Sequence, residues 1–288
     1  MEPNTKHGIW RAVMVLTAVG IMCWTNTTAS AVTIGGGLGD WGLGGTSTYT
    51  PYNSSTSPGN PASGFNSAKD VWYWEERGAI NPWGYVQPGY GGYKFDIQGL
   101  YFKYEGDRFY IAAVLGMPPG GADGLWDGTH WGGTQYLGDI ALSFDGTPST
   151  YEYGIETLGN NGHTAGAVYN NLTGWTIPPA GEFPASGDVN MKDGGSNSGL
   201  GRGFVYEKLG TATTGTGQNE VPLYYIEAAM DLPSDFHFGN TVRVHLTQTC
   251  GNDVGELNAV PTPEPGTMIL LGTGLVGLAG WGRKKFRK

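Results

Sequence analysis

The order of apolar and polar positions between residues 93 and 249 predicts short β-strands rather than helices. Residues 95–104 read as a strand whose apolar phase slips at Gly99, which indicates a β-bulge there. A turn at residues 105–107 leads into residues 109–115, an almost continuously apolar return strand. The two strands are therefore expected to form a hairpin.

A second hairpin is predicted between residues 139–145 and 150–156, joined by the turn residues Gly146, Thr147, Pro148 and Ser149. Further strands are expected at residues 165–177, 203–209, 223–230 and 241–249. No sustained helical periodicity occurs outside the two chain ends, so the pattern favours an all-β fold, an antiparallel jelly-roll-like β-sandwich.

The chain divides into four predicted parts. Residues 1–31 form a signal peptide, residues 32–70 a Gly/Ser/Pro-rich segment with little core of its own, residues 71–256 the β-sandwich, and residues 257–288 a linker and a hydrophobic tail.

The N-terminal part has the three regions of a secretory signal. Lys6 and Arg11 precede an apolar run over residues 12–24, and Ala29 and Ala31 flank Ser30 in an A-x-A cleavage site. The apolar run is too short for a spanning helix, which needs about 20 residues. We therefore expect signal peptidase to cut after Ala31.

The C-terminal part combines a proline motif, an apolar run and a basic end. Pro263, Glu264 and Pro265 precede the apolar residues 267–281, and Arg283, Lys284 and Lys285 follow them. The prolines keep the chain extended for a protease. The apolar run is expected to lie as a transmembrane helix in the inner membrane until processing, with the basic cluster on the cytoplasmic side.

These C-terminal features resemble the PEP-CTERM sorting signal of Gram-negative bacteria that make exopolysaccharide. The resemblance implies recognition by exosortase, a membrane cysteine transpeptidase. It also implies export across the inner membrane and a final place at the cell surface or in the extracellular matrix. It covers only residues 261–288 and does not bear on the chemistry of the central domain.

The net charge becomes more negative once both ends are removed. Seven of the 16 basic residues but only two of the 25 acidic residues lie in the ends, so the central region carries 9 basic and 23 acidic residues, a net charge of −14. This balance repels phosphates and excludes nucleic acid as a partner. Cys250 is the one cysteine left, so no internal disulfide forms, and we expect a buried structural thiol.

The central domain carries a second resemblance. The segments FDIQGLYFKYEGDRFYIAAVLGMPPGG, GDIALSFDG, YEYGIE and VRVHLTQTCGND are similar to uncharacterised PEP-CTERM proteins, and their strand order is similar to carbohydrate-binding family 9 and DOMON-like sandwiches. Proteins of that kind bind sugars, haem or calcium, or serve as matrix structure. Fold alone does not decide between these roles.

Catalytic motifs are missing from the sequence. It contains no G-x-S-x-G, H-E-x-x-H or P-loop motif. Glu75 and Glu76 are neighbours, and neighbours on a strand point to opposite faces, so they would not flank one glycosidic bond. The sequence therefore predicts that the protein is not an enzyme.

Tryptophans supply the candidate sugar contacts, because flat aromatic rings pack on sugar CH faces. Trp126 and Trp131 lie in the Gly-rich loop 118–133, while Trp72 and Trp74 are two apart and would share one strand face. Filling of the sandwich core is the alternative for each of them. Loop placement makes Trp126 and Trp131 the better candidates.

Calcium is the one cofactor for which the sequence offers candidate ligands. Residues 188–194 half-resemble an EF-hand loop, but Lys192 occupies a ligand position and Gly199 replaces the closing Glu, so that motif fails. Asp96, Asp139 and Asp145 lie at strand edges, where a sandwich could gather them around an ion; solvated strand ends are the alternative.

Two functional classes stay open. The first is a non-catalytic module that binds extracellular polysaccharide, and the second is a structural biofilm or surface protein without a discrete ligand. A secreted carbohydrate-active enzyme is a third and weaker alternative.

Overall fold

The computed structural model describes residues 32–45, 49–52, 61–76, 92–124, 133–145, 150–160, 162–178, 187–192, 194–213, 220–262 and 272–278. The folded unit begins at Val32, the residue that follows the predicted cleavage site.

Antiparallel strands make up nearly all of the regular structure. A 3₁₀ turn, η1 (Gly92–Phe95), precedes β3, and a short helix covers residues 272–278. The strands are β1 (Ala62–Asn66), β2 (Val71–Glu75), β3 (Ile97–Glu105), β4 (Arg108–Leu115), β5 (Ala122–Asp123), β6 (Thr134–Gln135), β7 (Ile140–Ser143), β8 (Tyr153–Ile155), β9 (Val168–Asn170), β10 (Ser196–Asn197), β11 (Gly201–Thr213), β12 (Glu220–Asp231), β13 (Val242–Thr247) and β14 (Val254–Ala259).

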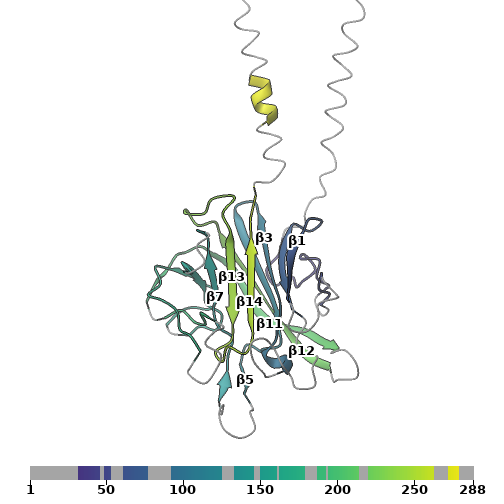
Figure 1. Ribbon diagram of the computed structural model, residues 1–288, viewed down its shortest axis with the longest axis vertical. Coiled ribbons are helices and arrows are strands. Elements are labelled where there is room, and N and C mark those ends of the chain that lie inside the picture. The colour runs from purple at the N-terminus through teal and green to yellow at the C-terminus, as the bar shows by residue number, and fades with distance from the viewer. Residues whose placement is uncertain are drawn as a thin grey trace, which may run out of the picture. The chain divides into compact units, whose positions relative to one another are not determined.

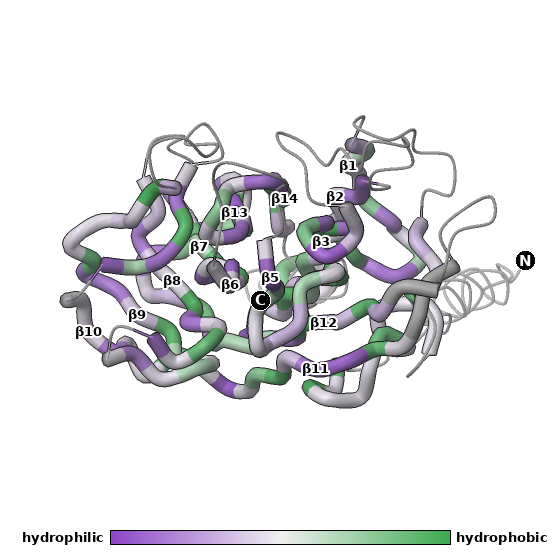
Figure 2. The backbone as a smooth tube through the Cα atoms, turned by 90° about the horizontal axis from the view of Figure 1, so that it is seen from below, coloured by the Kyte–Doolittle hydropathy of each residue, from purple (hydrophilic) through white to green (hydrophobic). Residues whose placement is uncertain are grey.

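Two six-stranded sheets pack face to face, with strand orders β1-β2-β3-β4-β12-β11 and β10-β9-β8-β7-β13-β14 (Figure 1). Each sheet is a four-stranded meander extended by a later hairpin, so the chain passes between sheets three times. The sheets meet closely where β14 packs on β3 and β2, as the end-on view in Figure 2 shows. The predicted all-β antiparallel sandwich is confirmed.

Strand alternation explains the core between the sheets. On β4, Phe109, Ile111, Ala113 and Leu115 point inward, and on β13 Val242, Val244 and Leu246 do the same from the other sheet. Phe109 and Phe144 stack across this core with ring centroids 5.2 Å apart. Cys250 is fully buried in the same core, as expected for a structural thiol.

Both predicted hairpins form. Strand β3 pairs with β4, and the register shifts between Ile97 and Gly99, where the sequence predicts the bulge. Gly106 closes the turn with a φ of 66°, a conformation that favours glycine. Strands β7 and β8 pair with Ile140 opposite Ile155.

The N-terminal segment differs from its predicted character. Val32, Leu38, Trp41 and Leu43 are buried against the outer face of the first sheet, in a second core with Tyr101, Tyr110, Ala112 and Val114. This cover explains why β4 is apolar at nearly every position, because both of its faces are buried. Strand β1 also lies before residue 71, where the predicted sandwich begins.

Candidate functional site

The predicted sorting residues and cleavage residues lie outside the described part of the chain: Ala29, Ala31, Pro263, Glu264, Pro265, Arg283, Lys284 and Lys285. What the structure describes is the end of the sandwich before the motif, where Gly239 N donates a hydrogen bond to Pro261 O (3.2 Å). The helix at residues 272–278 exposes Leu275, Val276 and Leu278. Within the described residues, every helix is too short or too polar to span a membrane.

Trp72 and Trp74 share the inner face of β2, as their spacing predicts. Trp74 is 6% exposed and belongs to the inter-sheet core. Trp72 packs on that core between Phe65 and Phe102, with ring centroids 4.5 Å and 6.0 Å away. This packing corresponds to the core alternative, although Trp72 stays partly exposed.

Trp126 and Trp131 lie outside the described residues, but the structure describes both ends of their loop. Strands β5 and β6 pair as a separate two-stranded ribbon, with Asp123 opposite Thr134. Gly124 N donates to Gly133 O (3.2 Å), so the ribbon continues up to the segment that carries the two tryptophans. Figure 1 shows β5 at one end of the sandwich, beyond the main sheets.

Asp139 and Asp145, predicted as possible metal ligands, lie at opposite ends of β7. Six residues at about 3.3 Å each separate them by roughly 20 Å. Asp145 is exposed and accepts a hydrogen bond from Ser143 Oγ (3.1 Å). The two carboxylates therefore do not meet at one ion.

Asp139 is instead part of a buried hydrogen-bond network. Its two oxygens accept hydrogen bonds from Thr157 N (3.1 Å) and Met191 N (2.9 Å). Burial, followed by the charge of the neighbouring Glu156, raises the pKa of Asp139 to about 8. A hydrogen bond with Glu156 acts in the same direction.

Glu156 is held in place by backbone donors. Its Oε1 accepts hydrogen bonds from the N–H groups of Leu158, Gly159 and Asn160 at 2.9–3.2 Å. His163 Nδ1 lies 3.3 Å from the other carboxylate oxygen. These contacts tie the loop after β8 to Asp139.

Asp96 has the least satisfied side chain of the three predicted ligands. It is 1% exposed, and neither carboxylate oxygen has a hydrogen-bond partner. Burial and then the charge of Glu76 raise the pKa of Asp96 to about 8. The nearby side chain of Gln98 lowers this pKa, but the two side chains do not form a hydrogen bond of ordinary geometry. Asp253 is fully buried, and burial followed by the charge of Asp96 raises its pKa well above the usual range.

The sequence did not identify Glu76 and Asp253 as neighbours of Asp96. Asp253 follows a strand of the second sheet, and Glu76 follows β2 in the first, so only the tertiary fold brings their charges to Asp96. The segment 248–253 that joins β13 to β14 contains the polar residues Gln248, Thr249, Asn252 and Asp253, but its composition does not show which distant side chain they meet. In the described ranges, no group of three His, Cys, Asp or Glu side chains is arranged to hold a metal ion.

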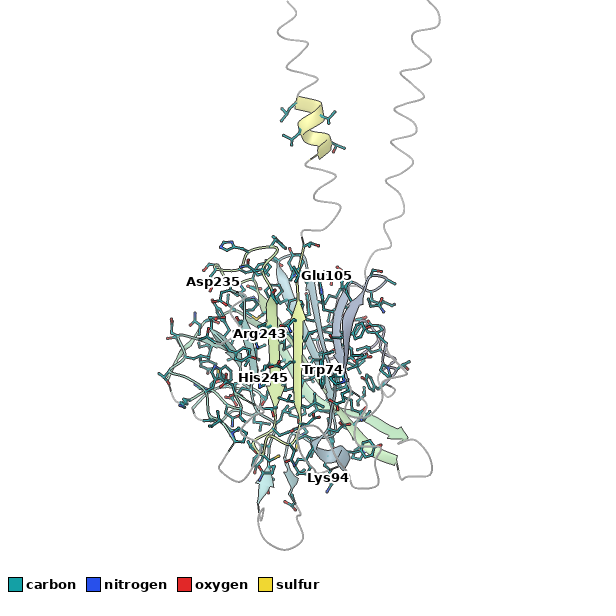
Figure 3. All side chains as sticks on the ribbon, in the orientation of Figure 1. Trp74, Lys94, Glu105, Asp235, Arg243 and His245 are labelled. Atoms are coloured by element: carbon teal, nitrogen blue, oxygen red, sulfur yellow. The ribbon has the colours of Figure 1, made fainter. Side chains whose placement is uncertain are left out.

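The outer face of β13 carries a further polar and aromatic cluster, near the middle of Figure 3. The Arg243 guanidinium lies 5.1 Å from the centre of the Tyr151 ring, and Trp175 meets the same ring edge-on. His245 Nδ1 lies 3.3 Å from Glu256 Oε1, and its Nε2 lies 2.9 Å from Asp188 O. Along the same strand Val242, Val244 and Leu246 face the inter-sheet core.

Comparison with known proteins bears on the C-terminal end alone. No curated protein and no solved structure matches the chain. The similarity of the central domain to carbohydrate-binding family 9 therefore stays a prediction. The PEP-CTERM protein-sorting motif matches residues 261–284, which include the proline motif, the apolar run and the first basic residues. The chain thus carries the sorting signal of an exported, exosortase-processed protein of the cell envelope or surface.

Proposed function

We propose that the processed chain is a non-catalytic β-sandwich that associates with polysaccharide at the cell surface or in the extracellular matrix. The sorting motif supports the location, because it directs the domain to the envelope. The domain is strongly acidic, with 23 acidic and 9 basic residues in its central region. Such a charge disfavours polyanions, so the partner we expect is a neutral glycan.

The paired ribbon of β5 and β6 is the observation that carries the proposal. It fixes the ends of a loop containing Trp126 and Trp131, outside both main sheets. Aromatic residues on a fixed stem contact a ligand at a low cost in conformational entropy. The tryptophans that lie on strands, Trp72 and Trp74, are used for packing instead.

The carboxylates of Glu75 and Glu76 favour a non-catalytic role. Both are nearly fully buried, at 1% and 4% exposure. Glu75 Oε1 accepts hydrogen bonds from Tyr101 OH and Tyr52 N, each at 2.8 Å, and so helps to hold the N-terminal segment. A glycosidase needs two carboxyl groups that reach opposite sides of one bond.

The test is binding of the processed chain to a glycan array and to the exopolysaccharide of the producing cells. Trp126→Ala and Trp131→Ala should each weaken binding about two- to tenfold, the loss expected when one stacked ring is removed. Phe65→Ala is the control, because Phe65 is an aromatic side chain, 46% exposed, on the edge strand β1.

Unchanged affinity in both tryptophan variants, with an unchanged melting temperature, would exclude the loop as the contact. An array without selective binding would support the structural surface protein instead. Release of reducing sugar from the polysaccharide would contradict the non-catalytic role.

A further inference from the structure

The buried carboxylate of Asp96 lacks a partner in either protonation state. Both oxygens are shielded from solvent, and no described donor or acceptor lies within hydrogen-bonding distance and geometry. A carboxylate in this position needs a donor or a cation, and a protonated carboxyl group needs an acceptor. Buried polar groups without partners cost free energy and are rare, so the site is incomplete as described.

Asp253 lies next to Asp96 and comes from the opposite sheet. Ile97 N, the amide directly after Asp96, donates to Asp253 Oδ2 (2.5 Å). Val254 N donates to Asp253 Oδ1 (2.8 Å), so each oxygen has one backbone donor and keeps a second lone pair. The Asp253 carboxylate is thereby held beside Asp96 in a fixed orientation.

The electrostatic surroundings of this pair are acidic. The negative charge of Glu76 raises the pKa of Asp96, and the charges of Asp96 and Glu76 both raise the pKa of Asp253. None of the ion pairs between described residues involves Asp96 or Asp253. When they are ionised, two adjacent buried carboxylates near a third acidic group require a compensating positive charge.

We propose that Asp96 and Asp253 together bind one calcium ion at this end of the sandwich. The donors are carboxylate oxygens, and hard oxygen ligands suit calcium rather than a soft transition metal. The remaining ligands are uncharged oxygens, because the described residues place no third acidic or His side chain around the same point. Calcium accepts backbone carbonyls and water in such positions.

The ion would join the two sheets. Asp96 directly precedes β3 in the first sheet, and Asp253 directly precedes β14 in the second. Lys94, labelled in Figure 3, marks this end of the molecule. The ion therefore stabilises the folded state, and its role does not depend on the proposed polysaccharide binding.

The experiment is thermal unfolding of the processed chain after removal of metal with EGTA. At pH 8, 10 mM CaCl₂ should raise the melting temperature by about 5–10 °C, for a dissociation constant near 0.1 mM as in extracellular calcium modules. The same concentration of MgCl₂ should have a much smaller effect, because magnesium requires stricter octahedral geometry. Isothermal titration should give one calcium per chain.

Asp96→Asn should abolish the calcium response. Asp145→Asn should keep it, because Asp145 is exposed just beyond the C-terminal end of β7 and is not part of the proposed site. If Asp96→Asn fails to fold, the titration of the wild-type chain still decides the question. Equal melting temperatures in EGTA and in calcium, or no calcium binding in the titration, would overturn the proposal. Stabilisation by acid alone would then identify a shared proton as the compensating charge.

Discussion

Trp41 Nε1 donates a 2.8 Å hydrogen bond to Glu227 Oε1 and so joins two residues that lie 186 positions apart in the chain. Glu227 Oε2 accepts a second hydrogen bond, from Gly35 N (2.7 Å). Both side chains are fully buried. Burial raises the pKa of Glu227, and these two donors act in the opposite direction. The N-terminal segment is therefore held on the first sheet by a polar contact as well as by its apolar side chains.

Trp41 should contribute strongly to stability. We expect Trp41→Ala to lower the free energy of unfolding by about 3–5 kcal/mol through the cavity it leaves. Trp41→Phe should cost less, about 1–3 kcal/mol, because it keeps an aromatic ring but removes one donor from Glu227. Urea unfolding followed by circular dichroism measures both. Ile177→Ala, at a side chain 62% exposed, should change stability by less than about 0.5 kcal/mol.

Two glycines four positions apart, Gly116 and Gly120, give a matched pair for backbone packing. A Cβ added at Gly116 would lie 1.5 Å from Tyr93 O, and backbone cannot swing aside. A Cβ at Gly120 would meet nothing within 4 Å. Gly116→Ala should therefore destabilise the domain by about 3 kcal/mol or more, whereas Gly120→Ala should be neutral or stabilise it by up to about 1 kcal/mol. Similar melting temperatures for the two variants would contradict this packing.

Local patterns predicted the hairpins well, because a bulge, a turn and an alternating strand are all set by nearby residues. The Gly99 bulge and the pairing of β7 with β8 are examples. Strand β14 and the cover over the first sheet were missed. In β14, Gly255 and exposed Glu256 and Asn258 hide the apolar alternation. In the N-terminal segment, Trp41 and Leu43 show their role only when the distant Glu227 and Tyr225 are brought to them.

The predicted ligand positions show the same limit. Strand ends were identified for Asp96, Asp139 and Asp145, but the sequence does not say which ends of different strands meet. The fold places Asp96 beside Asp253 and Asp139 beside Glu156, and leaves Asp145 at the surface. Pairing of this kind depends on the sheet order, which was not predictable from spacing.

The Asp139–Glu156 pair should make stability depend on pH. The folded chain keeps Asp139 protonated up to about pH 8, whereas an unfolded Asp releases its proton near the ordinary pKa of 3.8. The contribution of Asp139 is therefore complete below about pH 4 and decreases, by several kcal/mol, as pH rises toward 8. Glu156→Gln should flatten this decrease, because the amide group donates permanently to Asp139.

Melting temperatures between pH 4 and pH 9, in saturating calcium, measure this difference. Calcium is added so that the Asp96 site stays in one state throughout. Asp107→Asn is the control, since its side chain is 89% exposed, and its profile should follow the wild type. A Glu156→Gln profile parallel to the wild type over the whole range would show that Glu156 does not raise the pKa of Asp139.

Processing at both ends can be tested by the intact mass of the exported chain. The wild-type protein should lose residues 1–31 and most of the tail after the proline motif at 263–265. Replacing Pro263, Glu264 and Pro265 by alanine should leave the tail in place, because alanines permit helix where the prolines keep the chain extended. Val260→Ala, one residue before the matched motif, should be processed normally. The full tail on surface-exposed wild-type protein, or normal processing of the alanine variant, would show that the proline motif is not the recognition element.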